Sequence, residues 1–298
     1  MIPMRLFELA DLLGCRRPDS DREILDVVTD SREARPGVLF AALPGEHFDG
    51  HDFCGSAVSL GAEGLLVSRP VEVDAPQLVV DDVLLALGDI ARRVREKVDP
   101  AVVGITGSNG KTTVKEMVAA ILRQQGEVLA TGGNFNNELG LPLTLFRLTP
   151  EHRYAVLEMG AGKPGDIEYL ARIGRPDVGL VNNIAPAHLE GFGSLEGVAV
   201  TKGAMFAELP AEGWAVMNAD EPWLETWREM SQAGNTITFG VSEDADVRLV
   251  ESERGPLIRT PAGEFMPRLG LPGHHNLLNA AAATAIALVL DIDMDMIR

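Results

Sequence analysis

The sequence is poor in cysteine, in positive charge and in long apolar runs, and each shortage excludes a class of protein. Its two cysteines, Cys15 and Cys54, are too few for a disulfide framework, which favours a reducing environment. The 26 basic side chains are outnumbered by 44 acidic ones, and the net charge of −18 argues against nucleic acids and anionic membranes as partners. The most apolar run, residues 280–290, is too short to span a bilayer and predicts a buried, alanine-rich helix.

A targeting segment is not evident at the N-terminus. Arg5, Glu8 and Asp11 interrupt its apolar residues, unlike the apolar core of a secretory signal. We therefore expect a soluble cytoplasmic protein, and a monomer. A chain of 298 residues, with 46% hydrophobic and 23% charged residues, is long enough to form two domains with separate cores.

The order of apolar runs and turns predicts an α/β protein. Residues 1–82 contain four short strand-like runs, which indicate a small N-terminal α/β domain. From residue 101 onward strands alternate with helices, which predicts a phosphate-loop central domain with a mainly parallel sheet flanked by helices. We expect its helices to begin near residues 112, 166, 194, 221 and 276. A helix over 82–98 leads into this domain, so the expected domains are 1–82 and 83–298, with small antiparallel edge strands over 236–268.

The stretch GITGSNGKTT, residues 104–113, lies where a buried strand turns into an amphipathic helix. Such a turn presents free backbone N–H groups to an anion. Ile105 stands where the usual phosphate-loop pattern has its first glycine, but Gly110-Lys111-Thr112 at the end of the pattern is intact. Lys111 is expected to reach the β- and γ-phosphates of a nucleoside triphosphate, and the Thr112 hydroxyl to bind Mg²⁺. The alternative is a glycine-rich turn that only caps an ordinary helix.

Polar residues also follow other expected strands, at the edge where α/β sheets bind ligands. Glu158, in LEMGAG, is well placed to bind Mg²⁺; the alternative is a cap for the helix that starts in GDIEYL. His188 lies in the loop of NNIAPAHLEGFGS, where a lone histidine is more often an ordinary surface residue. Lys202 lies on the helix after that loop and, taken alone, predicts only a solvated lysine.

Taken together, these stretches resemble the Mur ligases of peptidoglycan synthesis. The family's motifs follow TDSREARPGVLFAALPGEHFDGHDF in this order: GSNGKTT, GNFNNELGLPLTL, LEMGAGKPGDI, NNIAPAHLEGFGSLEGVAVTKG and LPGHHNLLNA. The likeness runs through nearly the whole chain. It implies an ATP-dependent amide ligase of cell-wall synthesis. The AHLEGFGS and N-terminal stretches point to the member whose partners are UDP-MurNAc-tripeptide and D-Ala-D-Ala.

The resemblance also implies which residues bind ligands. Asn276 and Asn279 would contact the adenosine of ATP, and Ser31 and Arg32 belong to the UDP-binding stretch. The ATP phosphates would lie on the loop residues Gly107, Ser108, Asn109, Gly110, Lys111, Thr112 and Thr113. The substrate side would be lined by Asn134, Asn136 and Asn137.

Two Mg²⁺ ions are implied as well. Thr112 and Glu158 would bind the first ion, and His188 would help to bind the second. The implied catalytic residues are Lys111, His188 and Lys202. Lys202 corresponds to a lysine that CO₂ carbamylates in the family, and this change from cation to anion removes a repulsion between the side chain and Mg²⁺.

Two features depart from the family pattern. Ala204 follows Lys202-Gly203 where members have glutamate, so a local acidic partner is missing. The chain also stops where a C-terminal domain that closes over ATP would begin, and a DSYNANP-like segment is not found. We therefore expect a two-domain form without the C-terminal ligase domain, and negligible ligase activity from this chain alone.

Several alternatives stay open at this point. One is a related Mur-type ligase that adds an amino acid instead of D-Ala-D-Ala. Another is a fragment that binds nucleotide and UDP-precursor without turnover. A third is an unrelated phosphate-loop kinase or GTPase. The N-terminal stretch argues against folylpolyglutamate synthase, which lacks a UDP-binding domain of this kind.

Overall fold

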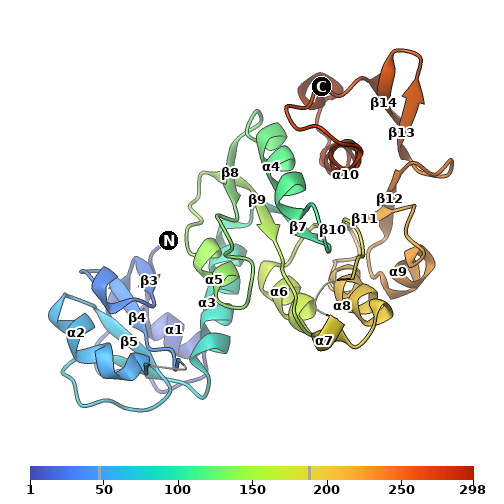
Figure 1. The fold of residues 1–298 in the computed structure, drawn as a ribbon. Coiled ribbons are helices and arrows are strands. Elements are labelled where there is room, and N and C mark those ends of the chain that lie inside the picture. The colour runs from blue at the N-terminus through green and yellow to red at the C-terminus, as the bar shows by residue number, and fades with distance from the viewer. Residues whose placement is uncertain (46–47, 187–188) are drawn as a thin grey trace. The chain divides into compact units, whose positions relative to one another are not determined.

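The computed structural model describes residues 1–45, 48–186 and 189–298, and the chain divides into two compact units (Figure 1). Unit 1 comprises Met1–Asp99 and Glu138–Pro150, and unit 2 comprises Pro100–Asn137 and Glu151–Arg298. The first boundary therefore falls after Asp99 and not after residue 82. The reason is that helix α3 (Val83–Val98) is amphipathic and packs its buried face against α1 and α5 of unit 1.

Unit 1 contains a four-stranded parallel sheet in the order β3-β4-β5-β6. Its strands are β3 (Asp26–Val28), β4 (Val38–Ala41), β5 (Gly64–Val67) and β6 (Gln77–Val79). A separate antiparallel pair is formed by β1 (Met4–Arg5) and β2 (Glu23–Ile24). The helices are α1 (Leu6–Leu12), η1 (Ser31–Glu33), η2 (Gly50–Phe53), α2 (Cys54–Ser59), α3 and α5 (Gly140–Leu145). The four predicted runs are confirmed as strands, and β4 and β5 are buried throughout, as central parallel strands are.

Unit 2 is built on a nine-stranded sheet in the order β15-β14-β13-β12-β11-β10-β7-β9-β8. The strands are β7 (Ala101–Thr106), β8 (Glu127–Ala130), β9 (His152–Glu158), β10 (Val178–Val181), β11 (Trp214–Asn218), β12 (Asn235–Gly240), β13 (Val247–Ser252), β14 (Gly255–Thr260) and β15 (Gly263–Phe265). Neighbours from β8 to β13 run parallel, and only β14 and β15 are antiparallel. The expectation of antiparallel strands throughout 236–268 is therefore wrong for β12 and β13, which extend the parallel sheet.

Helices cover both faces of this sheet (Figure 1). They are α4 (Lys111–Leu122), α6 (Asp166–Gly174), α7 (Leu189–Phe192), α8 (Leu195–Ala207), α9 (Leu224–Met230), α10 (His274–Val289) and α11 (Met294–Ile297). Helices α4 and α10 pack on one face, where the buried alanines of α10 allow a close approach to the sheet. Helices α6, α8 and α9 pack with one another on the other side. Among the described residues, the longest apolar helices fall short of what a membrane crossing requires.

Candidate active site

The predicted phosphate loop connects β7 to α4 in unit 2. Gly107 and Gly110 have φ angles of 148° and 78°, which side-chain-bearing residues rarely adopt. At Gly110 there is also no room, because a Cβ atom would lie 2.5 Å from Asn279 Oδ1 and 2.7 Å from Asn182 Nδ2. The loop therefore requires these two glycines, and α4 begins directly after it at Lys111.

Neutral amides hold the loop in place. The backbone N–H of Ser108 donates to Asn183 O at 2.9 Å, and that of Asn109 donates to Asn183 Oδ1 at 2.9 Å. The Nδ2 atoms of Asn182 and Asn183 both donate to Asn109 O at 3.0 Å. Asn182 Nδ2 also donates to Asn279 Oδ1 at 2.9 Å. Asparagines that follow β10 and one on α10 thus fix the backbone that would face a phosphate.

The two residues expected to contact adenosine lie in the first turns of α10 and are nearly buried. Asn276 donates to Pro272 O at 2.8 Å, and Asn279 Nδ2 donates to Asn276 Oδ1 at 3.3 Å. Since Asn279 Oδ1 accepts from Asn182, which donates to Asn109 O, this side chain supports the phosphate loop through Asn182. Contact of either residue with a nucleotide base stays a prediction.

Lys111 lies over the loop that precedes it. Its Nζ atom donates to Gly107 O at 2.9 Å and lies 3.5 Å from Ser108 O. Burial lowers the pKa of this half-buried lysine, and the negative charge of Glu158 partly opposes that effect. The ammonium therefore lies at the centre of the loop, where a phosphate-loop lysine contacts the phosphates.

Glu158, at the end of β9, faces Thr112 of the loop helix. The Thr112 hydroxyl donates to Glu158 Oε2 at 2.9 Å, and Asn136 Nδ2 donates to Oε1 at 2.9 Å. The alternative that Glu158 caps the next helix is wrong, because α6 has Gly165 at its N-cap and no side-chain cap. A nearly buried carboxylate beside a hydroxyl is an oxygen donor set of the kind that Mg²⁺ prefers.

The segment between β8 and α5 contributes one of its predicted residues to this cluster. Asn136 contacts Glu158, as described, and its carbonyl accepts from Gly160 N at 2.8 Å. Asn134 and Asn137 are exposed. Their contact with the substrate stays a prediction.

Lys115 was not predicted, although it lies four residues after Lys111 on the same helix. It is 2% exposed, and its Nζ atom donates to Thr131 O at 2.7 Å and lies 3.0 Å from Glu116 Oε1. Thr131 Oγ1 in turn accepts from Glu158 N at 3.0 Å. The buried ammonium therefore anchors the residue that holds the backbone of Glu158. The only sequence signal was the spacing of the two lysines, which does not distinguish a buried side chain from an exposed one.

Lys202 lies on α8 and is 3% exposed, so the expectation of a solvated lysine is wrong. Burial, and to a lesser extent the positive charge of Lys111, lowers the pKa of Lys202 to about 8. Within the described ranges, no carboxylate pairs with its ammonium, consistent with alanine at position 204. The charge of Lys111 thus acts on the second predicted lysine.

His188 lies outside the described residues, so its predicted role in metal binding remains a prediction. Near its loop the structure has an acidic group that the sequence did not indicate. Glu221 Oε1 accepts from Ile184 N at 2.9 Å. Burial raises the pKa of Glu221, the bond from Ile184 lowers it, and the negative charge of Asp220 raises it.

Ser31 and Arg32 line a hollow in unit 1. Its volume is about 770 Å³, and its apolar lining includes Phe48, which is 74% exposed, and Phe53. Arg32 donates to Asp30 Oδ2 at 2.6 Å, and hydrogen bonds from its side chain and backbone lower the pKa of Asp30 to about 2. Aromatic surface beside a charged rim suits a ligand with a flat ring at one end and anionic groups at the other.

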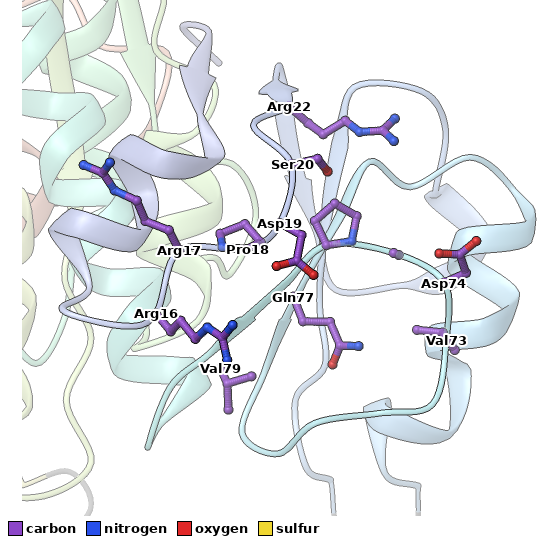
Figure 2. Close-up of a pocket in the computed structure, with 12 residues that line it drawn as sticks. Arg16, Arg17, Pro18, Asp19, Ser20, Arg22, Val73, Asp74, Gln77 and Val79 are labelled. Atoms are coloured by element: carbon purple, nitrogen blue, oxygen red, sulfur yellow. The ribbon is translucent and has the colours of Figure 1, made fainter.

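A second hollow of unit 1 was not predicted (Figure 2). Its volume is about 530 Å³, and the loop that lines one side carries Arg16, Arg17 and Arg22. Arg17 pairs with Asp11, and Arg22 pairs with Glu63 at 2.7 Å. Two of the three arginines are therefore engaged by carboxylates of the protein itself.

Unit 2 thus has a glycine loop at a helix N-terminus, a lysine over it and a carboxylate at the next strand end. This arrangement defines a phosphate-loop nucleotide-binding α/β protein. The Mur ligase middle domain matches residues 105–287, and the Mur ligase family catalytic domain matches residues 23–95. The chain belongs to the Mur ligase family, which excludes an unrelated phosphate-loop kinase or GTPase.

Relatives support this assignment along the whole chain. UDP-N-acetylmuramoyl-tripeptide–D-alanyl-D-alanine ligase of Escherichia coli is 46% identical over 100% of this chain and 67% of its own length. The structure of MurF from Acinetobacter baumannii superposes with a TM-score of 0.92 at 36% identity, over 99% of this chain and 67% of that one. MurF from Thermotoga maritima in complex with ADP gives 0.82 at 33% identity, over 96% and 66%. The chain therefore spans about two thirds of the length of these relatives.

Proposed function

We propose that this chain supplies the nucleotide and UDP-precursor sites of a ligase that adds D-Ala-D-Ala to UDP-MurNAc-tripeptide. The observation that carries the proposal is the cluster of Lys111, Thr112 and Glu158 at the carboxyl ends of the parallel strands. The names of the relatives support the choice of substrates. ATP is the expected nucleotide, and the ADP complex of the Thermotoga maritima relative supports it.

The reaction forms an amide bond at the expense of ATP. The terminal carboxylate of the tripeptide attacks the γ-phosphorus, which gives an acyl phosphate and ADP. The amine of D-Ala-D-Ala then attacks the acyl carbon, and phosphate leaves. The main obstacle is electrostatic, because a carboxylate must approach a triphosphate. Lys111 and the backbone N–H groups at the start of α4 reduce that repulsion and hold the phosphates in line for attack.

Thr112 and Glu158 fit Mg²⁺ at this position. Both offer oxygen atoms, and they already lie within hydrogen-bond distance of each other. In the described part of the chain, no group of three or more histidine, cysteine or acidic residues forms a complete metal site. That agrees with an ion held by one or two protein oxygens together with nucleotide phosphates. When bound, Mg²⁺ neutralises charge that develops on the phosphate oxygens.

We also propose that CO₂ carbamylates the Lys202 amine. An uncharged amine attacks CO₂, loses a proton and becomes a carbamate anion. Burial and the neighbouring charge of Lys111 favour the uncharged form, because they lower the pKa of Lys202 to about 8. A carbamate would also supply the negative charge that position 204 lacks.

We expect carbamylation of Lys202 to increase as the pH rises through about 8 at constant dissolved CO₂, because the reactive amine is uncharged above that value. Isotopically labelled bicarbonate should give a carbamate carbon signal in the NMR spectrum of the chain. Lys202→Arg should remove the signal, and Lys97→Arg, a change in unit 1, should keep it. An equal signal in Lys202→Arg would contradict the assignment.

The UDP end of the precursor is proposed to bind in the hollow lined by Ser31 and Arg32. We expect Arg32→Ala to weaken binding of UDP-MurNAc-tripeptide about tenfold, since one charge-assisted contact to the diphosphate is lost. ATP affinity should not change, because the phosphate loop lies in unit 2. Calorimetric titration of both ligands measures the two effects. Arg16→Ala, in the other hollow, is the matched control, and a loss there equal to that in Arg32→Ala would remove Arg32 from the site.

A related ligase that adds an amino acid is the second candidate, because the chain covers only part of its relatives. That enzyme would act on a precursor one residue shorter, so its N-terminal unit would prefer UDP-MurNAc-dipeptide. Competition between the dipeptide and tripeptide precursors for the purified chain distinguishes the two. Preference for the tripeptide supports the proposed function, and preference for the dipeptide overturns it.

A further inference from the structure

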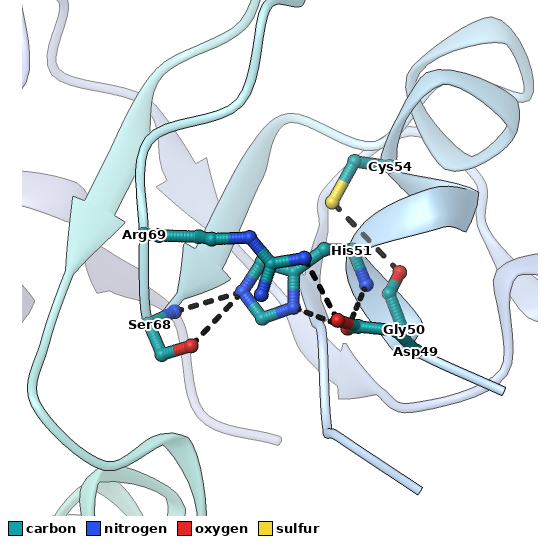
Figure 3. Close-up of polar contacts among 6 residues, drawn as sticks. All are labelled: Asp49, Gly50, His51, Cys54, Ser68 and Arg69. Atoms are coloured by element: carbon teal, nitrogen blue, oxygen red, sulfur yellow. Dashed lines mark hydrogen bonds and ion pairs between the residues drawn. The ribbon is translucent and has the colours of Figure 1, made fainter. Parts of the chain in front are cut away.

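His51 is a buried polar residue of unit 1 to which the proposed mechanism gives no role. It lies on η2, and its side chain is only 2% exposed (Figure 3). The segments that surround it are the chain around η2 and the residues that follow β5. Both its ring nitrogens are engaged, so the residue does not simply fill space.

The hydrogen bonds of the ring define its protonation state. Nδ1 lies 2.6 Å from Asp49 Oδ1, and Nε2 lies 3.0 Å from the backbone N of Ser68 (Figure 3). A backbone N–H can only donate, so Nε2 must accept and carries no proton. A carboxylate can only accept, so Nδ1 must carry the proton. His51 is therefore the neutral Nδ1–H tautomer.

Asp49 is the other centre of this network. It accepts from His51 N at 2.9 Å and from Arg69 Nη2 at 2.7 Å, in addition to the imidazole. The backbone bond from His51, the bond from Arg69 and the imidazole bond together hold the pKa of Asp49 well below its usual range. The carboxylate stays ionised and joins η2 to the end of β5 through Arg69 as well as through His51.

This network fixes a wall of the hollow that contains Ser31 and Arg32. Gly50 and Phe53, at the two ends of η2, line that hollow. Gly50 packs closely against the chain, because its N–H donates to Leu43 O at 2.9 Å and an added Cβ would lie 2.7 Å from Leu43 N. A small shift of η2 would therefore change the shape of the hollow, and His51 is a buried residue of η2 that ties it to the end of β5, beside the Asp49–Arg69 pair.

Ser68, His51 and Asp49 are also the residue types of a serine-hydrolase triad. Their geometry indicates instead that His51 holds the backbone in position and does not act as a general base. Ser68 Oγ lies 3.2 Å from Nε2, whereas the backbone N of the same residue lies at 3.0 Å. The single lone pair of Nε2 is thus already taken by a donor that cannot be deprotonated in catalysis. The imidazole is not free to remove a proton from the hydroxyl.

We propose that His51 is a positioning residue for the UDP-precursor site: it holds η2 against the end of β5 so that Gly50 and Phe53 keep the wall of the hollow in its binding shape. This inference rests on the proposed function, which assigns the UDP end of the precursor to that hollow. The proposed ligand is a uridine diphosphate, whose flat ring would pack against the apolar wall of the hollow. His51 acts through the backbone of η2 and does not itself touch the ligand.

The test compares precursor and ATP affinity in variants of the full 298-residue chain. His51→Phe keeps a ring of similar size and removes both hydrogen bonds, so we expect the Kd for UDP-MurNAc-tripeptide to rise about tenfold or more. The Kd for ATP should stay unchanged, because its loop lies in unit 2. His51→Gln retains an acceptor toward Ser68 N and should recover part of the loss. Ser68→Ala keeps the backbone donor and should bind like the parent.

Three results would overturn the inference. The first is parent-like precursor affinity in a folded His51→Phe variant. The second is a loss in Ser68→Ala as large as that in His51→Phe, which would assign the role to the hydroxyl. The third is an imidazole nitrogen NMR spectrum of the parent that shows a proton on Nε2, a measurement that does not depend on how any variant folds. If the parent itself fails to bind the precursor, the proposed function falls first and the inference falls with it.

Discussion

Replacing Lys111 with alanine is expected to abolish measurable ATP binding, with a fall in affinity of about a hundredfold or more. The Lys111 ammonium lies over the phosphate loop, bonded to Gly107 O at 2.9 Å. Alanine leaves the loop amides in place but removes the only positive charge that contacts them among the described residues. The remaining N–H groups would then have to hold a triphosphate without a cationic partner in an acidic protein.

The fold should survive this change, which keeps the result interpretable. Lys111 is half-buried, and within the described part of the chain the bonds from its side chain go only to carbonyls of the loop. The loop itself is held by asparagines, so its backbone does not depend on the lysine. Calorimetry with Mg²⁺-ATP gives the affinity, and thermal unfolding verifies the structure. As a control, Lys97→Ala removes one lysine charge from unit 1 and should bind ATP normally. Unchanged ATP affinity in Lys111→Ala would contradict the assignment of the phosphate loop.

A polypeptide limited to residues 1–298 is expected to bind both ligands and to form almost no ligated product. It has the loop, Glu158 and Lys202, but it spans about two thirds of its relatives, 67% of the Escherichia coli enzyme. The family resemblance assigns the remaining part to a domain that closes over ATP and positions the incoming amine. Orientation and exclusion of water account for many orders of magnitude of rate in such reactions, so their loss should be severe.

The measurement is product formation from UDP-MurNAc-tripeptide, ATP and D-Ala-D-Ala, followed by mass spectrometry of the UDP-MurNAc-pentapeptide. The full-length Escherichia coli relative serves as the positive control, and calorimetry on the same sample verifies that the ligands bind. Turnover by residues 1–298 at ordinary enzyme rates, roughly 1–10³ per second, would show that the remaining segment is not needed for catalysis.

Local patterns predicted the elements of unit 2 better than their arrangement. The predicted helix starts near 112, 166 and 194 lie within one residue of those observed, because a helix start depends on a few neighbouring residues. The sheet order, with β9 between β7 and β8, depends on pairing between distant segments and was not predictable. The same is true of residues 138–150, which return to unit 1 to pack α5 against α3.

The residues of the candidate sites also divide into those that the sequence could predict and those that it could not. The phosphate loop and Glu158 were predictable because strand ends of a parallel sheet meet at one edge, so residues far apart in sequence fall together. Lys115 and His51 were not, since the sequence does not show whether a polar side chain points into the core. Each has a partner, Thr131 O or Ser68 N, that is a backbone atom, and backbone atoms have no sequence signature of their own.

The asparagine support of the phosphate loop has a consequence for the effect of ionic strength. The contacts that shape residues 108 and 109 are hydrogen bonds between their backbone groups and uncharged amide groups of Asn182 and Asn183, which dissolved ions screen very little. The attraction between Lys111 and a triphosphate is coulombic and is screened. Added salt should therefore lower the affinity for the nucleotide without changing the conformation of the phosphate loop. Nucleotide affinity and loop geometry thus depend on ionic strength independently of each other.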